Sequence, residues 1–239
     1  MSNKRSASGK QAVPEAAQVL AGTALAGNGK PASSHVKKKR AAQRLRIMRA
    51  AIGEFAAKGY ERTTMQDIAN ALEATSASLY YYFGSKEELL FVALDTVLSD
   101  LLAALSAAVE RAGAAPLTAM RNLITAHVTF ELADPTVGPL VNAHLYGPRY
   151  LVDMLSVGQQ ASLRRQQRAI YEVYRDVVRK GVATGLFRAQ DVTLAVFDLL
   201  AIVQYPAVWF RSGGPLDIPA VAERQADIAL RIVAETPEP

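Results

Sequence analysis

Apolar residues recur at helical spacing over most of the chain from residue 41 onward. In residues 41–58, Ile47, Ala51 and Phe55 stand four positions apart, which places them on one face of a helix. Gly59 follows them and is a natural end for that helix. Runs that alternate between apolar and polar residues are missing and no segment repeats, so the pattern predicts an all-α fold.

Two shorter helices are predicted next. Thr64 is a good N-cap, and Asp67 follows three residues later in a pattern close to a capping box. The apolar face of this helix stops near Glu73. A second short helix begins at Thr75 or Ser76 and extends to about residue 82.

The remaining chain is predicted to form longer helices separated by turn residues. Ser85 and Glu88 have the spacing of a full capping box, which opens the first of these helices. Pro206 is expected to kink or end one of them, and Asp217 to cap the last. The expected ranges are 87–112, 117–132, 136–145, 150–182 with a division near 158, 192–210 and 218–234.

Two short helices joined by a break of a few residues match the helix-turn-helix, whose second helix enters the DNA major groove. The second helix has small hydroxyl side chains and tyrosines and no acidic residue, which suits contact with phosphates and base edges. Lys86 stands in the first turn of the next helix, where a phosphate would be favoured. The candidate DNA-binding residues are Thr64, Thr75, Ser76, Ala77, Ser78, Tyr80, Tyr81 and Lys86.

The stretch IANALEATSASLYYYFGSKEELL resembles the DNA-binding signature of the TetR family of bacterial transcription regulators, and IMRAAIGEFAAKGYERTTMQDIA resembles the helix that precedes it. The resemblance covers about residues 44–94 in matching order and spacing. One position departs from the family pattern, because Glu73 stands where glycine is usual. If that backbone position requires a positive φ, a non-glycine residue costs roughly 1 kcal/mol there.

The resemblance implies a DNA-binding domain at 41–88 and a helical domain at 89–235 that binds a small effector and forms a homodimer. The dimer would use the last two helices through Leu194, Phe197, Leu200, Ala201, Val208, Val221, Ile228, Leu230 and Ile232. Two recognition helices would then read a palindromic double-stranded operator with half-sites ~34–36 Å apart or a multiple of that. An effector would shift the equilibrium between DNA-matching and mismatched dimers, most commonly relieving repression.

Candidate effector contacts are polar or aromatic residues within apolar helical stretches, although each is also an ordinary core residue. These candidates are His127, Glu131, His144, Arg149, Tyr150, Arg164, Tyr171 and Trp209. The phrase VWFRSGGPLDIPAVAERQADIAL resembles the end of family members that sense acyl-CoA thioesters or related acids. Under that reading, Arg149 or Arg164 would meet an anionic group.

Positive charge is concentrated at the N-terminus. Residues 1–40 carry +7, residues 41–88 carry 0 and residues 89–239 carry −2. The first 40 residues are rich in Ser, Ala, Gly and Lys, which predicts a disordered tail. This tail is either a mobile arm that grips DNA or a solubilising leader without contacts.

Cysteine content, the length of apolar runs and the absence of catalytic motifs limit the classes of protein to which this chain could belong. Cysteine is absent, which excludes disulfides and thiolate metal sites and agrees with a cytoplasmic protein. No apolar run approaches the ~20 residues that span a bilayer, so no membrane partner is expected. No cofactor or metal is implied, and no P-loop, G-x-S-x-G or H-E-x-x-H supports an enzyme. A DNA-bound adaptor that recruits a protein partner is the second alternative, and an internal cavity would argue against it.

Overall fold

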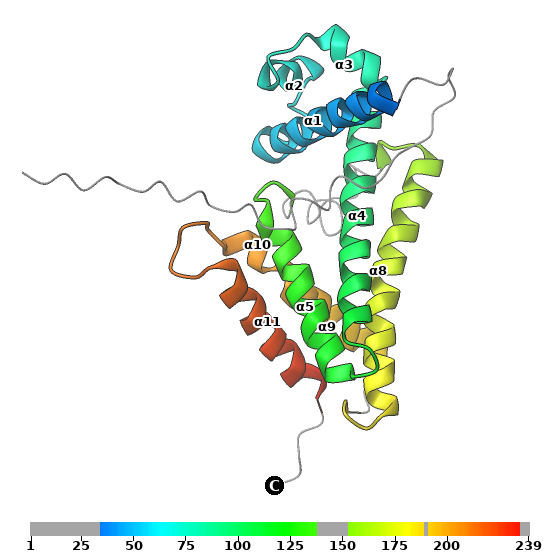
Figure 1. Cartoon of the computed structure of the whole chain (residues 1–239), viewed down its shortest axis with the longest axis vertical. Helices are drawn as coiled ribbons and strands as arrows, with labels where there is room; N and C mark the ends of the chain where they lie inside the picture. The colour runs from blue at the N-terminus through cyan, green and yellow to red at the C-terminus, as the bar shows by residue number, and fades with distance from the viewer. Residues whose placement is uncertain (1–33, 138–152, 189–190, 235–239) are drawn as a thin grey trace, which may run out of the picture.

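The computed structural model of the protein describes residues 34–137, 153–188 and 191–234. In chain order its helices are α1 (Ser34–Lys58), α2 (Met65–Ala71), α3 (Ser76–Tyr82), α4 (Lys86–Arg111), α5 (Pro116–Ala133), α8 (Val157–Ala183), α9 (Val192–Gln204), α10 (Pro206–Trp209) and α11 (Ile218–Val233) (Figure 1). Within these residues the only strand-like pairing is an isolated antiparallel bridge between Phe187 and Ala234. The predicted all-α fold is confirmed.

Helix α4 connects the two halves of the molecule. Its N-terminal end packs against α1 in the small upper unit formed by α1, α2 and α3, and its length then packs against α5 and α8 (Figure 1). Helix α11 covers α5 and touches α9. The contact face of α4 is a stripe of leucines at helical spacing, all at most 2% exposed: Leu90, Leu94, Leu98, Leu101 and Leu105.

Two helical segments, Lys86–Arg111 and Val192–Trp209, are long and apolar enough to cross a membrane by length and composition alone. The expectation from sequence that no stretch reaches this threshold was therefore too strict. The core helix of a helical domain passes the same test, and half of the most apolar window of α4 is buried inside the fold. Packing within the protein thus accounts for the apolar character of α4.

Several boundaries differ from the sequence prediction. Helix α1 begins at Ser34 rather than near residue 41, because the three lysines and the arginine of residues 37–40 are good helix formers. Residues 34–40 are therefore helical instead of disordered. Helix α8 begins at Val157, where Ser156 and Gln159 form a capping box. Most of the helix predicted over 136–145 lies outside the described residues.

Proline and acidic caps act as predicted at the C-terminal helices. Helix α9 ends at Gln204, and Pro206 opens the short helix α10 in the N-terminal position that proline tolerates. Asp217 caps α11 by accepting a hydrogen bond from the backbone N–H of Ala220 at 2.8 Å. The predicted capping box at Ser85 is only half formed, because the Glu88 carboxylate accepts from the N–H of Gly84 instead of that of Ser85.

Candidate functional site

Local capping fixes the two short helices of the upper unit. The Thr64 hydroxyl accepts from the N–H of Asp67 at 3.1 Å, and the Asp67 carboxylate accepts from the N–H of Thr64 at 2.8 Å, which completes the predicted capping box. The Thr64 hydroxyl and the Thr64 N–H both donate to the Asp67 carboxylate and hold its pKa well below the usual range, with a further contribution from the Lys58 ammonium. Thr75 caps α3 through the N–H of Ser78 at 3.2 Å.

The turn between α2 and α3 is a Schellman motif built on Glu73. The N–H of Ala74 donates to the carbonyl of Ala69 at 2.9 Å, and the N–H of Glu73 donates to the carbonyl of Asn70 at 3.1 Å. Glu73 has φ 52°, and no other non-glycine residue of the described ranges has a positive φ. The backbone thus keeps the left-handed geometry of the family's turn although glycine is absent.

Helix α3 is anchored from below by its apolar residues and from the side by a cation. Leu79 and Phe83 are 0% and 1% exposed. The Arg44 guanidinium of α1 lies 4.2 Å from the centre of the Phe83 ring and donates to the carbonyl of Tyr82, at the end of α3. Arg44 is therefore half-buried, and burial lowers its pKa.

The Lys86 side chain is bound to main-chain groups of the protein itself. Its ammonium donates to the carbonyls of Tyr60 and Thr63, both at 3.0 Å, and lies 4.2 Å from the centre of the Tyr60 ring. These contacts join the start of α4 to the segment before α2. A phosphate contact by Lys86 would have to use its remaining N–H or replace these bonds.

The outer face of α3 is open to a ligand. Thr75, Ala77 and Ser78 are exposed, and the side chains of Tyr80 and Tyr81 are 52% and 69% exposed. The remaining candidates differ slightly: Thr64 is exposed at the start of α2, and Ser76 is half-buried with its hydroxyl donating to Gln66. This surface offers hydroxyl groups and aromatic rings without a carboxylate of its own.

Helix α9 carries an exposed apolar stripe in the lower half of the molecule, and an exposed apolar residue lies on α10. Leu194 and Phe197 of α9 are 65% and 56% exposed, and Val208 of α10 is 60% exposed. On α11, Ile228 is 43% exposed, whereas Val221 is 2% exposed and belongs to the internal core. Val221 thus lies inside the protomer because the face of α11 that carries it packs on the rest of the fold.

An open cavity of about 730 Å³ lies between α8 and α9, with residues of α4 and α5 at its base. Apolar side chains make up most of the lining surface, the base also holds the buried His127, and three arginines from α8 lie at the rim, with Arg164 and Arg168 exposed and Arg175 half-buried. The lining residues are Leu101, His127, Arg164, Gln167, Arg168, Ile170, Tyr171, Arg175, Thr193, Phe197, Leu200 and Gln204. A volume of this size matches the range of small-molecule sites, roughly 300–1,000 Å³.

The rim arginines differ in their partners. Arg168 and Arg175 both pair with Glu172, whereas the Arg164 guanidinium donates to the neutral amide oxygen of Gln160 at 3.3 Å. Arg175 also lies 3.9 Å from the Asp176 carboxylate, so three guanidinium groups face two carboxylates and positive charge remains in excess at the rim. Planar guanidinium groups bind carboxylates and phosphates through paired hydrogen bonds.

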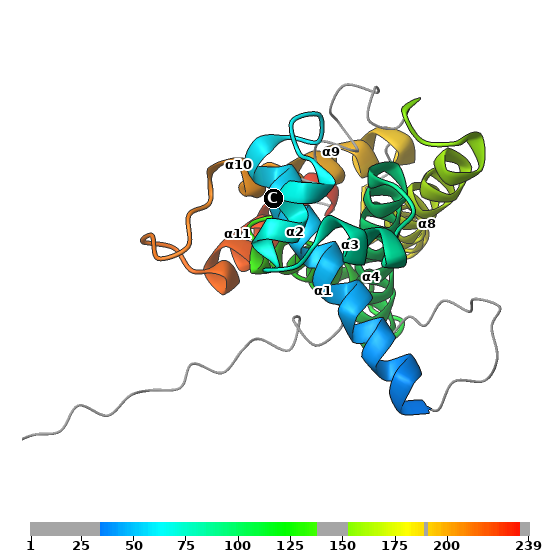
Figure 2. The ribbon, with the colours of Figure 1, turned by 90° about the horizontal axis from the view of Figure 1, so that it is seen from above.

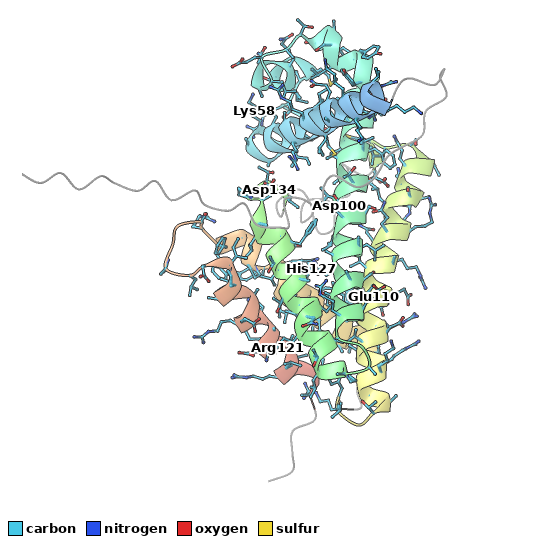
Figure 3. All side chains as sticks on the ribbon, viewed as in Figure 1. Lys58, Asp100, Glu110, Arg121, His127 and Asp134 are labelled. Carbon is cyan, nitrogen blue, oxygen red and sulfur yellow. The ribbon has the colours of Figure 1, made fainter. Side chains whose placement is uncertain are left out.

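A buried polar cluster borders the base of the cavity. His127 Nδ1 and the Tyr174 hydroxyl share a hydrogen bond of 2.6 Å, and His127 Nε2 lies 3.4 Å from the Glu131 carboxylate. His127 and Glu131 are each 1% exposed. Figure 3 shows His127 on α5. Within the described residues, neither Nε2 nor either Glu131 oxygen has a hydrogen-bond partner, which is costly for buried groups.

The structure therefore brings together part of the predicted effector set. His127, Arg164 and Tyr171 line the cavity, and Glu131 lies directly behind His127. Trp209 is 40% exposed on α10 and is not a lining residue. Three other candidates lie outside the described residues: His144, Arg149 and Tyr150.

Sequence reasoning missed several cavity residues, notably Arg168, Arg175 and Gln204. Arg164, Arg168, Tyr171 and Arg175 are spaced by three or four residues, so they share one face of α8. A helical wheel of 157–183 would have grouped the three arginines. Gln204 carried no such signal, because its burial at 5% exposure depends on packing against other helices.

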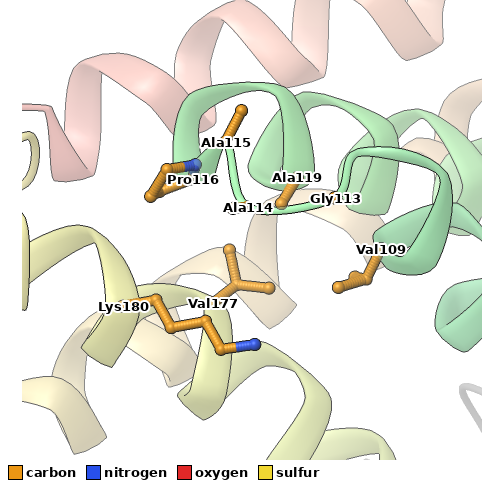
Figure 4. Close-up of a pocket in the computed structure, with 8 residues that line it drawn as sticks. All are labelled: Val109, Gly113, Ala114, Ala115, Pro116, Ala119, Val177 and Lys180. Atoms are coloured by element: carbon orange, nitrogen blue, oxygen red, sulfur yellow. The ribbon is translucent and has the colours of Figure 1, made fainter.

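A second, smaller hollow lies near the C-terminal end of α4, where Val109 and Gly113 face Val177 and Lys180 of α8 (Figure 4). Its volume of about 10 Å³ accommodates a water molecule but no metabolite. Among the described residues, no group of three or more His, Asp or Glu side chains is arranged to hold a metal ion.

The helix-turn-helix on an all-helical second domain defines a class of DNA-binding regulator with a separate ligand domain. Two family models match the chain: "Bacterial regulatory proteins, tetR family" over residues 47–93, and "Tetracyclin repressor-like, C-terminal domain" over residues 113–233. The chain belongs to the TetR family of transcription regulators.

Known relatives agree with this assignment. The transcriptional repressor KstR2 of Mycobacterium tuberculosis is 30% identical over 186 residues, which cover 77% of this chain and 89% of the relative. The structure of the TetR-family regulator PfmR from Thermus thermophilus superposes with a TM-score of 0.68 at 34% identity, covering 78% of this chain and 97% of PfmR. AibR, solved with isovaleryl coenzyme A and operator DNA, shares the fold with a TM-score of 0.68 at 21% identity, over 78% and 97% of the two chains.

Proposed function

We propose that this protein is a cytoplasmic homodimeric repressor that leaves a palindromic operator when an anionic amphiphile, such as an acyl-CoA or related acid, binds the cavity between α8 and α9. The cavity itself carries the proposal. It combines a mostly apolar lining, in a volume that accommodates an acyl group, with three arginines at the rim that suit phosphate or carboxylate groups. An adaptor that only recruits a protein has no need of such a site.

DNA binding is assigned to the unit formed by residues 41–88. The exposed hydroxyls of Thr75 and Ser78 contact phosphates or base edges, and Tyr80 and Tyr81 lie against sugars or thymine methyl groups. Arg44 and Lys86 act indirectly, since their contacts with main-chain carbonyls set the position of α3 and of the start of α4.

The second unit, from residue 89 to 235, binds the effector and forms the dimer. The exposed apolar stripe on α9 with Leu194 and Phe197 supplies the dimer contact. Phe197 also lines the cavity and its ring lies 5.8 Å from that of Tyr171. A ligand in the cavity therefore contacts the dimer face through Phe197 and contacts α4, whose upper end carries the DNA-binding unit. Such a ligand shifts the equilibrium between arrangements of the dimer.

The effector proposal is tested by thermal shift with acyl-CoAs of increasing chain length, the matching free acids and coenzyme A alone. A ligand at 100 times its Kd stabilises the folded state by about 2.7 kcal/mol. Arg164→Gln should weaken binding of the anionic ligands, whereas Arg179→Gln, an exposed arginine of the same helix that does not line the cavity, should not. Absence of stabilisation by every anionic amphiphile would contradict the proposal.

The operator proposal is tested separately by footprinting the protein on DNA that flanks its own gene. A protected palindrome that is released on addition of a stabilising ligand supports ligand-relieved repression. Protection that persists with the ligand bound argues for activation or co-repression instead.

A further inference from the structure

The N-terminal turns of α1 carry a cluster of positive charge that the helix does not balance. Lys37, Lys38, Lys39 and Arg40 are all exposed, and the first turn of α1 holds no acidic residue. The N-terminal end of a helix is the positive end of its dipole, and cations there are unfavourable. Lys37 and Arg40 also stand at like-charged i, i+3 positions. A polyanion would relieve both repulsions.

This cluster adjoins the outer face of α3. The Arg40 guanidinium lies 5.7 Å from the centre of the Tyr81 ring, which is 69% exposed on the proposed DNA-contacting surface. Seen from above, the blue end of α1 projects past the rest of the upper unit (Figure 2). The basic turns therefore continue the surface of α3 outward instead of forming a separate patch.

The remaining basic residues of the DNA-binding unit are mostly engaged within the protein. Residues 41–88 have no net charge. Lys58 pairs with Glu54 at 2.7 Å and with Asp67 at 3.0 Å, and Arg62 donates to the carbonyl of Lys58 at 2.7 Å. Arg44 and Lys86 are bound to main-chain carbonyls. This unit consequently has few free cations with which to neutralise phosphates.

We infer that the segment of Lys37 to Arg40 is a phosphate-binding extension of the DNA interface, which grips the sugar–phosphate backbone beside the major groove read by α3. Its partner is duplex DNA of any sequence, because lysine ammonium groups contact phosphates without reading bases. The extension supplies affinity and salt dependence, whereas α3 supplies the choice of sequence. Arg40, packed on Tyr81, fixes the extension relative to the recognition helix.

The test compares the full-length protein with the variant Lys37→Gln/Lys38→Gln/Lys39→Gln. The matched control is Arg111→Gln/Arg179→Gln/Lys180→Gln, which removes the same charge from exposed residues at the far ends of α4 and α8. Affinity for the footprinted operator fragment and for a random-sequence duplex of equal length is measured across a salt series. Wild-type binding to the operator tests the proposed DNA-binding function itself, whereas the change of slope in the lysine variant tests the extension.

Each phosphate contact contributes about 0.9 to the slope of log K against log salt, so the lysine variant should lower the slope by up to about 2.7 per protomer on both duplexes. The preference for operator over random DNA should stay unchanged, and the control should keep the wild-type slope. Lysine-to-arginine replacement at the three positions should preserve the slope, because the charge is kept. An unchanged slope in the glutamine variant, or an equal fall in the control, would overturn the inference.

Discussion

The left-handed conformation of Glu73 leads to a quantitative prediction. At φ 52° an L-residue with a side chain is strained by roughly 1–2 kcal/mol, and glycine is not. Glycine also gives the unfolded chain more freedom, which costs about 0.4–1 kcal/mol relative to alanine. Glu73→Gly should therefore be more stable than Glu73→Ala by about 0.5–1 kcal/mol, since both variants remove the same exposed carboxylate.

The chain contains a matched reference for this substitution. Gly185 ends α8 in the same motif, with φ 71°, its N–H donating to the carbonyl of Val182 at 3.0 Å and the next N–H donating to that of Gly181 at 3.1 Å. A Cβ at Gly185 would meet no heavy atom within 4 Å, so only backbone strain opposes alanine there. Gly185→Ala should destabilise the protein by an amount similar to the difference between Glu73→Gly and Glu73→Ala.

Urea denaturation followed by circular dichroism measures both effects as free energies of unfolding. Thermal unfolding should shift by roughly 2–4 °C per kcal/mol for a chain of this size. Two results would contradict the proposed backbone strain: Glu73→Gly no more stable than Glu73→Ala, or Gly185→Ala unfolding at the wild-type urea concentration. The first result would mean that the turn relaxes out of the left-handed region in solution.

Three further predictions use the same structure. Gly181→Ala should lower the free energy of unfolding measured in urea by about 1–3 kcal/mol, because the new Cβ would lie 2.0 Å from the buried Phe187 ring. Gly53→Ala is the control, since its Cβ would meet no atom within 4 Å, and it should stabilise α1 by roughly 0.5–1 kcal/mol. Burial raises the pKa of Asp100 to about 6, above its unfolded value near 3.9, so its stabilising contribution is complete below pH ~4 and is lost as pH rises through 6. Asp100→Asn should accordingly be more stable than wild type at pH 7 by roughly 1–3 kcal/mol, and the advantage should vanish near pH 4 in urea titrations. Phe197→Glu should convert the proposed dimer to a monomer in light scattering, whereas Val157→Glu, at a still more exposed apolar site on α8, should leave it intact.

Features that depend on residues close in the chain could be read from the sequence. The capping box of Thr64 and Asp67, the Asp217 cap and the end of α9 before Pro206 were all predicted, and they form as expected apart from small shifts in helix ends. The unusual backbone at Glu73 was also anticipated from a single non-glycine residue in the turn. These features follow from hydrogen bonds and dihedral preferences within a few residues.

Tertiary packing decided what those helices carry. Lys86 was predicted to meet phosphate, yet its ammonium lies between the carbonyls of Tyr60 and Thr63, which are 26 and 23 positions away in the chain. The cavity combines residues of α4, α5, α8 and α9, and the hydrogen bond between His127 and Tyr174 spans 47 positions. Side-chain chemistry and helical spacing specify which residues share a face. The partner of that face is set by the packing of distant helices, so the cavity emerged only from the folded chain.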